Sequence, residues 1–219
     1  MHDNIWEGLR IFDYNRIGEN ANKLSENRNS SRIVFETLKQ LIYNKQAAWR
    51  RAVFILLEII IAIQIAKNIE TVSIVKEIGG YIGQVQAGLI GAVFTGYALF
   101  QALIGDTLLL YLLTVEKKQK TKLQELNESF VCLLVMQILA LLFDVLIYLI
   151  MNAVPKDWCF TTIDSLNVGM ATSCIGVMIY INVETIWELK SFIFNVYQVF
   201  NANAMSRVVD IIEQKKEKK

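Results

Sequence analysis

Long apolar runs alternate with short polar segments along the chain, and this pattern predicts its elements. An α-helix rises about 1.5 Å per residue, so about twenty apolar residues cross the core of a bilayer. Runs of about that length or longer recur, and we expect four of them to be membrane spans: residues 52–69, 87–115, 130–153 and 166–187. The sequence therefore predicts an all-α, polytopic membrane protein with four transmembrane helices and cytoplasmic helical extensions.

The longest run, residues 87–115, reads AGLIGAVFTGYALFQALIGDTLLLYLLTV. It is longer than a span needs, so we expect one helix that is tilted or extends beyond the lipid. Residues 70–83 before it are expected to be a short connection. Small residues recur every four positions in two stripes, which favours close approach of other helices and also fits ordinary packing: Gly83, Ala87, Gly91 and Thr95, then Gly88, Ala92 and Gly96.

The segment before the first span is polar or amphipathic. Residues 1–30 are expected to be a cytoplasmic N-terminal segment, with a short amphipathic helix over 1–17 and a polar linker over 18–30. A helix predicted over 31–51 then continues without a glycine or proline into the first span. The membrane domain is therefore expected to begin at this helix and to cover residues 31–187.

Two further polar segments follow the second and fourth spans. Residues 116–128 are expected to form a charged helical turn or a helical extension. Residues 188–219 continue the helical pattern as an amphipathic helix with a basic tail. Its apolar stripe suits either packing on the 31–51 helix or a seam between subunits, and the sequence favours neither.

Basic residues are distributed very unevenly, although the totals, 22 Lys and Arg against 21 Asp and Glu, nearly cancel. Nine of them lie in residues 1–51, four in 116–128 and six in 188–219. The remaining three are Lys67, Lys76 and Lys156, in the two opposite loops. The positive-inside rule then places both termini and the 116–128 segment in the cytoplasm. We therefore expect a multi-pass protein of the inner (plasma) membrane.

Each predicted span carries an acidic residue, which is costly in lipid unless it faces protein, water or a basic partner. Apart from Lys67 near the end of the first, no Lys, Arg or His lies within a predicted span to neutralise these acids. Rings of acids favour cations in channels. The candidates for a pore lining are Glu58, Gln101, Asp106, Asp144 and Glu184, with Asp106 and Glu58 the strongest. The alternative is a packing role, with hydrogen bonds from neighbouring amides: Gln64, Gln101, Gln137 and Asn182.

Basic side chains gather where the spans are expected to meet the cytoplasm: Arg50, Arg51, Lys117, Lys118, Lys120 and Lys122. Basic clusters beside a span commonly hold anionic lipid headgroups. The same cluster would also suit an anionic nucleotide or oligonucleotide ligand.

The sequence contains few residues in patterns that catalyse reactions or bind metals. The chain has one histidine, and its three cysteines lack metal-binding spacing. It contains no phosphate-binding glycine loop and no hydrolase or metalloprotease motif. We therefore expect no catalytic residue, no metal and no cofactor, and we do not expect an enzyme.

Two stretches carry a resemblance to a known class of proteins. One is YNKQAAWRR, residues 43–51, which leads into the first span, and the other is KTKLQELNESF, residues 120–130. The region they bracket, residues 31–130, resembles the SLATT-type and four-span membrane effectors of prokaryotic antiphage conflict systems. Those effectors often have an acid after the phenylalanine, where this chain has Val131. The resemblance implies a pore or membrane-disrupting oligomer, opened by a partner protein or a nucleotide-derived signal.

The leading hypothesis is therefore an oligomeric ion channel or permeabilising effector, gated from the cytoplasmic side by a nucleotide signal or a soluble partner protein. Helices 31–51 and 188–212 would carry the signal because each continues into a span. Two alternatives stay open. One is a membrane anchor or adaptor that docks a soluble partner through its C-terminal helix, and the other is a small ion-coupled transporter.

Overall fold

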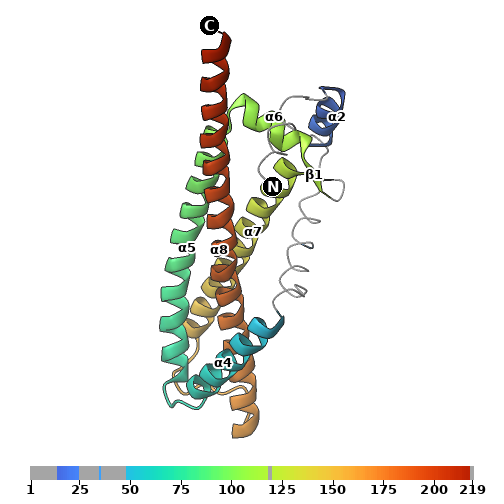
Figure 1. The fold of residues 1–219 in the computed structure, drawn as a ribbon. Coiled ribbons are helices and arrows are strands. Elements are labelled where there is room, and N and C mark those ends of the chain that lie inside the picture. The colour runs from blue at the N-terminus through green and yellow to red at the C-terminus, as the bar shows by residue number, and fades with distance from the viewer. Residues whose placement is uncertain (1–13, 25–34, 36–47, 118–119, 218–219) are drawn as a thin grey trace. The chain divides into compact units, whose positions relative to one another are not determined.

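The computed structural model describes residues 14–24, 35, 48–117 and 120–217 (Figure 1). The described residues are almost entirely helical, which confirms the predicted all-α class. The elements in chain order are α2 (Tyr14–Leu24), α4 (Ala48–Ala66), α5 (Thr71–Leu103), α6 (Asp106–Thr114), β1 (Glu116–Lys117), β2 (Lys120–Thr121), α7 (Lys122–Ala153) and α8 (Asp164–Glu217). The two short strands pair antiparallel, with Glu116 opposite Thr121.

Three of the described helices are long and apolar enough to cross a membrane: α5, α7 and the part of α8 from Asp164 to Val208. They indicate a multi-pass membrane protein. Helix α4 is 19 residues long and is not among the three. Its sequence is apolar from Ala52 onward, but it also carries Arg50, Arg51 and Glu58.

The predicted single helix over 87–115 is wrong. Helix α5 ends at Leu103, and α6 begins at Asp106 after Gly105, whose backbone is extended (φ −79°, ψ 167°). Glycine disfavours a helix interior, and an acid is stabilised in the first turn of a helix by the helix dipole. Both residues therefore favour a new start at this point, inside a run whose apolar character is otherwise uniform.

The expected connection over 70–83 is also wrong, because α5 already begins at Thr71. Gly79 and Gly80 are not turn residues but points of close approach to α7. A Cβ atom on Gly79 would lie 3.5 Å from the carbonyl oxygen of Asp144, and one on Gly80 would lie 3.4 Å from the ring of Tyr148.

Several other boundaries differ from expectation. Part of the polar linker predicted over 18–30 is helical, because α2 extends to Leu24. The 116–128 segment is a strand pair followed by the first turns of α7. The predicted continuation of the last span through 188–212 is confirmed, since α8 is one uninterrupted helix. The amphipathic helix over 1–17 and the helix over 31–51 lie mostly outside the described residues.

The chain forms two compact units. Unit 1 comprises residues 1–33, 93–132 and 190–219, and unit 2 comprises residues 34–92 and 133–189. Their borders do not follow the predicted division at residues 30 and 187, because α5, α7 and α8 each contribute to both units.

Unit 1 has an aromatic core. The ring of Phe130 lies 4.8 Å from Tyr97, 5.2 Å from Phe100 and 5.0 Å from Phe192, measured between centroids. Leucines complete the buried set: Leu108, Leu112 and Leu113 of α6, and Leu123 and Leu126 of α7. The Asn20 amide of α2 donates to the Leu113 carbonyl oxygen at 2.9 Å, which fixes α2 on α6.

Unit 2 contains α4, the first part of α5, most of α7 and the first part of α8. Each contributes about twenty residues, a length that suits a bilayer core. A short turn joins α4 to α5 and the 154–163 loop joins α7 to α8. Near these connections the core is apolar and centres on Ala62, Val75 and Ile175. Further along the helices, polar residues replace these apolar ones.

Candidate functional site

Unit 2 is polar inside and apolar outside. Large apolar side chains are exposed along α4 and α7, among them Ile55, Leu56, Ile60, Leu142, Leu146 and Leu149. Buried in the same unit are eight polar or charged residues: Arg51, Glu58, Gln86, Gln137, Asp144, Asn182, Glu184 and Thr185. Soluble proteins bury charged groups rarely and seldom expose large apolar patches, so this arrangement is that of helices surrounded by lipid.

Asn182 of α8 is the centre of a hydrogen-bond network. Its Oδ1 accepts from Nε2 of Gln86 on α5 at 2.8 Å, and its Nδ2 donates to Oδ1 of Asp144 on α7 at 2.9 Å. The same Nδ2 donates to the Met178 carbonyl oxygen, also at 2.9 Å. Three helices are thereby tied together through polar groups that are at most 3% exposed.

Small residues on α5 bring Asp144 to this position. A Cβ atom on Gly83 would lie 3.9 Å from that of Asp144, and Gly79 faces the Asp144 carbonyl oxygen. Gln86 is three residues beyond Gly83 and seven beyond Gly79, so all three share one face of α5. The glycines therefore allow α5 and α7 to approach closely, as predicted, at the position where Asp144 accepts a hydrogen bond from the Asn182 amide.

Several atoms of the network have no hydrogen-bond partner in the described part of the chain: Asp144 Oδ2, Gln86 Oε1, and both side-chain polar atoms of Gln137. Gln137 and Asp144 lie seven residues apart on α7 and are both fully buried. An unsatisfied buried polar group costs about 1–3 kcal/mol, and in native proteins it is usually matched by water or an ion. The polar interior thus continues along α7 beyond the hydrogen-bonded trio.

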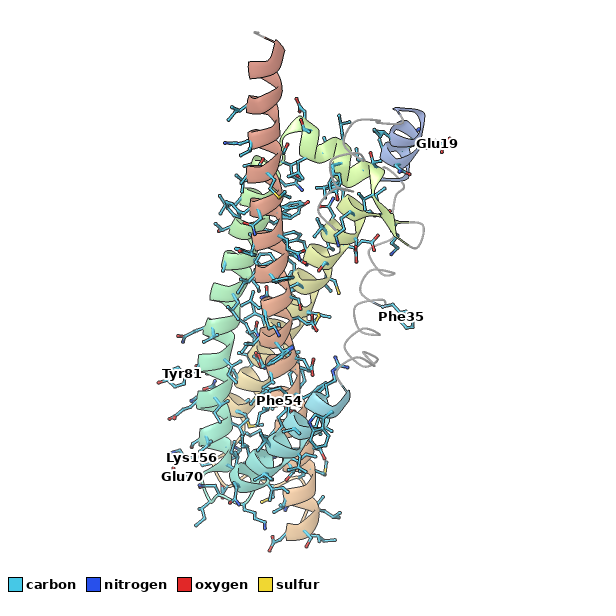
Figure 2. All side chains as sticks on the ribbon, in the orientation of Figure 1. Glu19, Phe35, Phe54, Glu70, Tyr81 and Lys156 are labelled. Carbon is cyan, nitrogen blue, oxygen red and sulfur yellow. The ribbon has the colours of Figure 1, made fainter. Side chains whose placement is uncertain are left out.

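A second polar cluster joins α4 to α8. The Arg51 guanidinium donates from Nε to Glu184 Oε1 and from Nη2 to Glu184 Oε2, both at 3.1 Å. The two side chains are 9% and 6% exposed. The ring of Phe54, labelled in Figure 2, lies 5.5 Å from that of Trp187 and adds an aromatic contact between the same helices. This bidentate pair is the strongest geometry that an arginine and a carboxylate can form.

Glu58 lies seven residues beyond Arg51 and faces the same interior. It is 6% exposed, and its Oε1 has no hydrogen-bond partner among the described residues. Unit 2 therefore holds three buried carboxyl groups, of which Glu184 has a bidentate cationic partner.

The predicted pore-lining residues separate into two groups. Glu58, Asp144 and Glu184 are buried in unit 2, whereas Gln101 and Asp106 are exposed in unit 1. Asp106, the strongest candidate from the sequence together with Glu58, lies in the first turn of α6, where the helix dipole stabilises an acid. It therefore belongs to a different unit from the other acids.

The basic candidates are also distributed differently from expectation. The acids were expected to need protein, water or a basic partner, and Arg51, one residue before the first predicted span, pairs with Glu184. Lys120 pairs with Glu128 at 2.6 Å and Lys122 with Glu125 at 2.8 Å, both in unit 1. The side chains of Arg50 and Lys117, and all of Lys118, lie outside the described part of the structure.

Sequence reasoning missed Gln86 and the bridging role of Asn182. A signal was available for Gln86, since a polar residue on the glycine face of a helix points toward whatever helix packs there. The described residues contain no group of three or more His, Cys, Asp or Glu that could hold a metal ion. Comparison of the chain with protein-family models, with curated proteins and with solved structures found no match.

Proposed function

We propose that this chain is a four-span membrane protein that forms an oligomeric cation channel or permeabilising effector, with the polar interior of unit 2 as part of the ion path. One observation carries the proposal: Asp144 is fully buried inside an apolar-surfaced unit and has no ion pair within the described residues. Ionisable residues inside a membrane are costly and typically mark ion or proton pathways.

The chemistry around Asp144 supports a cation. Its Oδ2 and the Gln86 Oε1 are oxygen acceptors without a hydrogen-bond donor in the described chain. Carboxylate and amide oxygens are the ligands that hard cations prefer. The orphaned amide of Gln137 extends the same polar lining along α7.

The exposed face of α4 supports a fourth span. Its side chains from Val53 to Ile61 are largely apolar and outward-facing, as lipid contact requires. Trp49, at the start of the helix, is 82% exposed and suits a membrane interface. Helix α4 differs from the three candidate spans because it carries three charged residues within a length of 19 residues. Two of these, Arg51 and Glu58, are buried and so do not face the surroundings of the helix.

Gating from the cytoplasmic side follows from the charge distribution and from α8. The basic residues favour cytoplasmic termini. Helix α8 carries Glu184 and runs without interruption to Glu217, so a displacement of its C-terminal part reaches the Arg51–Glu184 pair. We propose that this pair holds the closed state, and that a soluble protein or nucleotide signal of the kind implied by the effector resemblance releases it.

Planar-bilayer recordings test the proposal. We expect cation-selective currents from the purified oligomer, larger in Glu184→Gln because that change removes the charge that holds Arg51. Asp144→Asn should lower the cation conductance at least about tenfold, since a fixed charge in the path attracts the ion. Asp106→Asn is the matched control and should leave conductance unchanged. Equal currents in Asp144→Asn, or none in both the native protein and Glu184→Gln, would contradict the proposal.

One observation favours a second candidate function, a membrane anchor that docks a soluble partner. The C-terminal part of α8 exposes apolar side chains at helical spacing, including Ile193, Tyr197, Phe200 and Val208. The same face also suits a seam between subunits. A monomer without conductance that loses a soluble partner on Tyr197→Glu would indicate the anchor. Saturable uptake of one substrate would instead indicate a small ion-coupled transporter.

A further inference from the structure

A cavity of about 210 Å³ lies in unit 2 where the α4–α5 turn meets the α7–α8 loop. Its walls are mainly apolar and come from four helices, with Ala66, Val75, Ile147, Met151, Ala171 and Ile175 among them. Liquid water occupies about 30 Å³ per molecule, so the volume equals that of about seven waters. Its mainly apolar walls favour an apolar occupant over water.

Hydrogen bonds hold the walls in place. The Asn167 side chain accepts from the Thr161 backbone N–H and donates to the Thr161 carbonyl oxygen, both at 2.7 Å, which fixes the α7–α8 loop on α8. On the other side, the Thr71 hydroxyl donates to the Ile65 carbonyl oxygen at 2.9 Å and fixes the α4–α5 turn. The cavity is therefore a built feature rather than a gap under a loose loop.

The mouth of the cavity combines aromatic and charged groups. Trp158 and Phe160 line it, with ring centroids 4.3 Å apart, and so do Lys156 and Asp157. Lys156 is labelled in Figure 2. Tryptophan concentrates at the level of lipid headgroups, and a lysine there extends its charged end toward them. An apolar cavity with such a mouth matches an amphiphile, with the phosphate of its head facing Lys156 rather than Asp157.

We propose that this cavity binds one acyl chain of a phospholipid from the surrounding bilayer, with the lipid phosphate near Lys156. The lining includes Met178, the wall residue of α8 furthest along the helix from the α7–α8 loop, and its carbonyl oxygen accepts a hydrogen bond from Asn182. The bound chain would thus end beside the residue that links Gln86 to Asp144. Binding of the chain does not depend on ion conduction, so the two proposals are tested separately.

Photocrosslinking in nanodiscs tests this site. The probe is a phosphatidylglycerol that carries a diazirine near the end of one acyl chain, and adducts are mapped by mass spectrometry. We expect adducts on cavity-lining residues of α7 and α8, including Met151 and Ile175. Adducts confined to outward residues such as Leu142 and Leu146 would overturn the proposal.

A pair of neighbouring substitutions supplies the control. Ala171 lines the cavity, whereas Met170 next to it is 44% exposed and is not part of the wall. Ala171→Trp should fill the cavity and lower the wall adducts at least about tenfold, while Met170→Trp should leave them unchanged, since a filled core site excludes further atoms. If Ala171→Trp does not fold, Ala171→Leu should still lower the adducts. Equal labelling of correctly folded Ala171 and Met170 variants would overturn the site.

Two further labelling experiments identify the headgroup of the ligand. Lys156→Gln should weaken labelling by the phosphatidylglycerol probe, because it removes the charge that faces the phosphate. A diazirine fatty acid of the same chain length, added at equal concentration, should label the wall less than the phospholipid does. Stronger labelling by the free fatty acid would contradict a phospholipid as the occupant.

Discussion

Among the described residues, only unit 2 buries charged side chains, although three helices contribute to both units. Unit 1 buries rings and leucines around Phe130 and carries exposed charged pairs such as Lys122–Glu125. Unit 2 buries Asp144, Asn182 and Glu184 and exposes Ile and Leu. The first arrangement is favoured in water and the second in lipid. The comparison indicates that each helix changes its surroundings near the unit border.

Helix α7 shows this change within one element. In its unit 1 part, Leu126 and Phe130 are buried and Glu125 is exposed. In its unit 2 part, Gln137 and Asp144 are fully buried, and Leu142 and Leu146 are exposed by 55% and 56%. Both parts are helical, so the polarity of the inward and outward faces, and not the periodicity, distinguishes them.

The largest expected effect tests the apolar core of unit 1. Phe130→Ala removes the ring that contacts Tyr97, Phe100 and Phe192, so we expect a loss of about 3–5 kcal/mol in unfolding free energy. Phe94→Ala is the control, because Phe94 is 54% exposed, and it should cost much less. Chemical denaturation in a mild detergent measures both, and equal losses would show that unit 1 is not organised around this cluster.

The next effect tests the polar interior of unit 2. Arg51→Met leaves Glu184 buried without its cation, which should cost about 3 kcal/mol or more. Adding Glu184→Leu should recover most of the loss, since removing both charges removes the unpaired one. Lys122→Met, which breaks an exposed pair, should cost at most about 1 kcal/mol. Thermal unfolding followed by circular dichroism ranks the variants, and no recovery in the double variant would contradict a buried pair.

A smaller effect concerns helix spacing on α5. A Cβ atom on Gly96 would lie 2.5 Å from the ring of Phe192, whereas one on Gly88 would meet nothing within 4 Å. Gly96→Ala must displace the ring and should destabilise by about 1–3 kcal/mol. Gly88→Ala should be neutral or stabilising, because alanine favours the helix by about 1 kcal/mol. The same unfolding assay compares the two, and destabilisation by Gly88→Ala would show a contact at Gly88 that the described part of the chain does not contain.

Much of the fold follows from residue patterns that are local in sequence. Apolar runs and helical spacing predicted the all-α class and the continuation of α8 past residue 187, because both depend on neighbouring residues. The break before Asp106 was missed, since one glycine inside an apolar run is a weak signal. The connection expected over 70–83 is wrong because the role of Gly79 and Gly80, close approach to α7, depends on a distant helix.

The candidate site was predictable in part for the same reason. A buried acid such as Asp144 is conspicuous within an apolar run, and Gln137 and Asn182 were expected as amide partners of the acids. The Arg51–Glu184 pair joins residues far apart in the chain, and nothing local indicates it. The sequence favours Asp106 over Asp144, but the continuous span expected around Asp106 is absent from the described structure, since α5 ends at Leu103 and α6 begins at Asp106.

Spin labels along α7 test the central claim, that unit 2 is surrounded by lipid and unit 1 by water. In a background without the native cysteines, labels at Leu142 and Leu146 report on unit 2 and a label at Glu125 reports on unit 1. In liposomes, we expect the first two to be relaxed mainly by oxygen, which concentrates in lipid, and the third mainly by a water-soluble nickel chelate. Nickel access at Leu142 and Leu146 equal to that at Glu125 would contradict the claim.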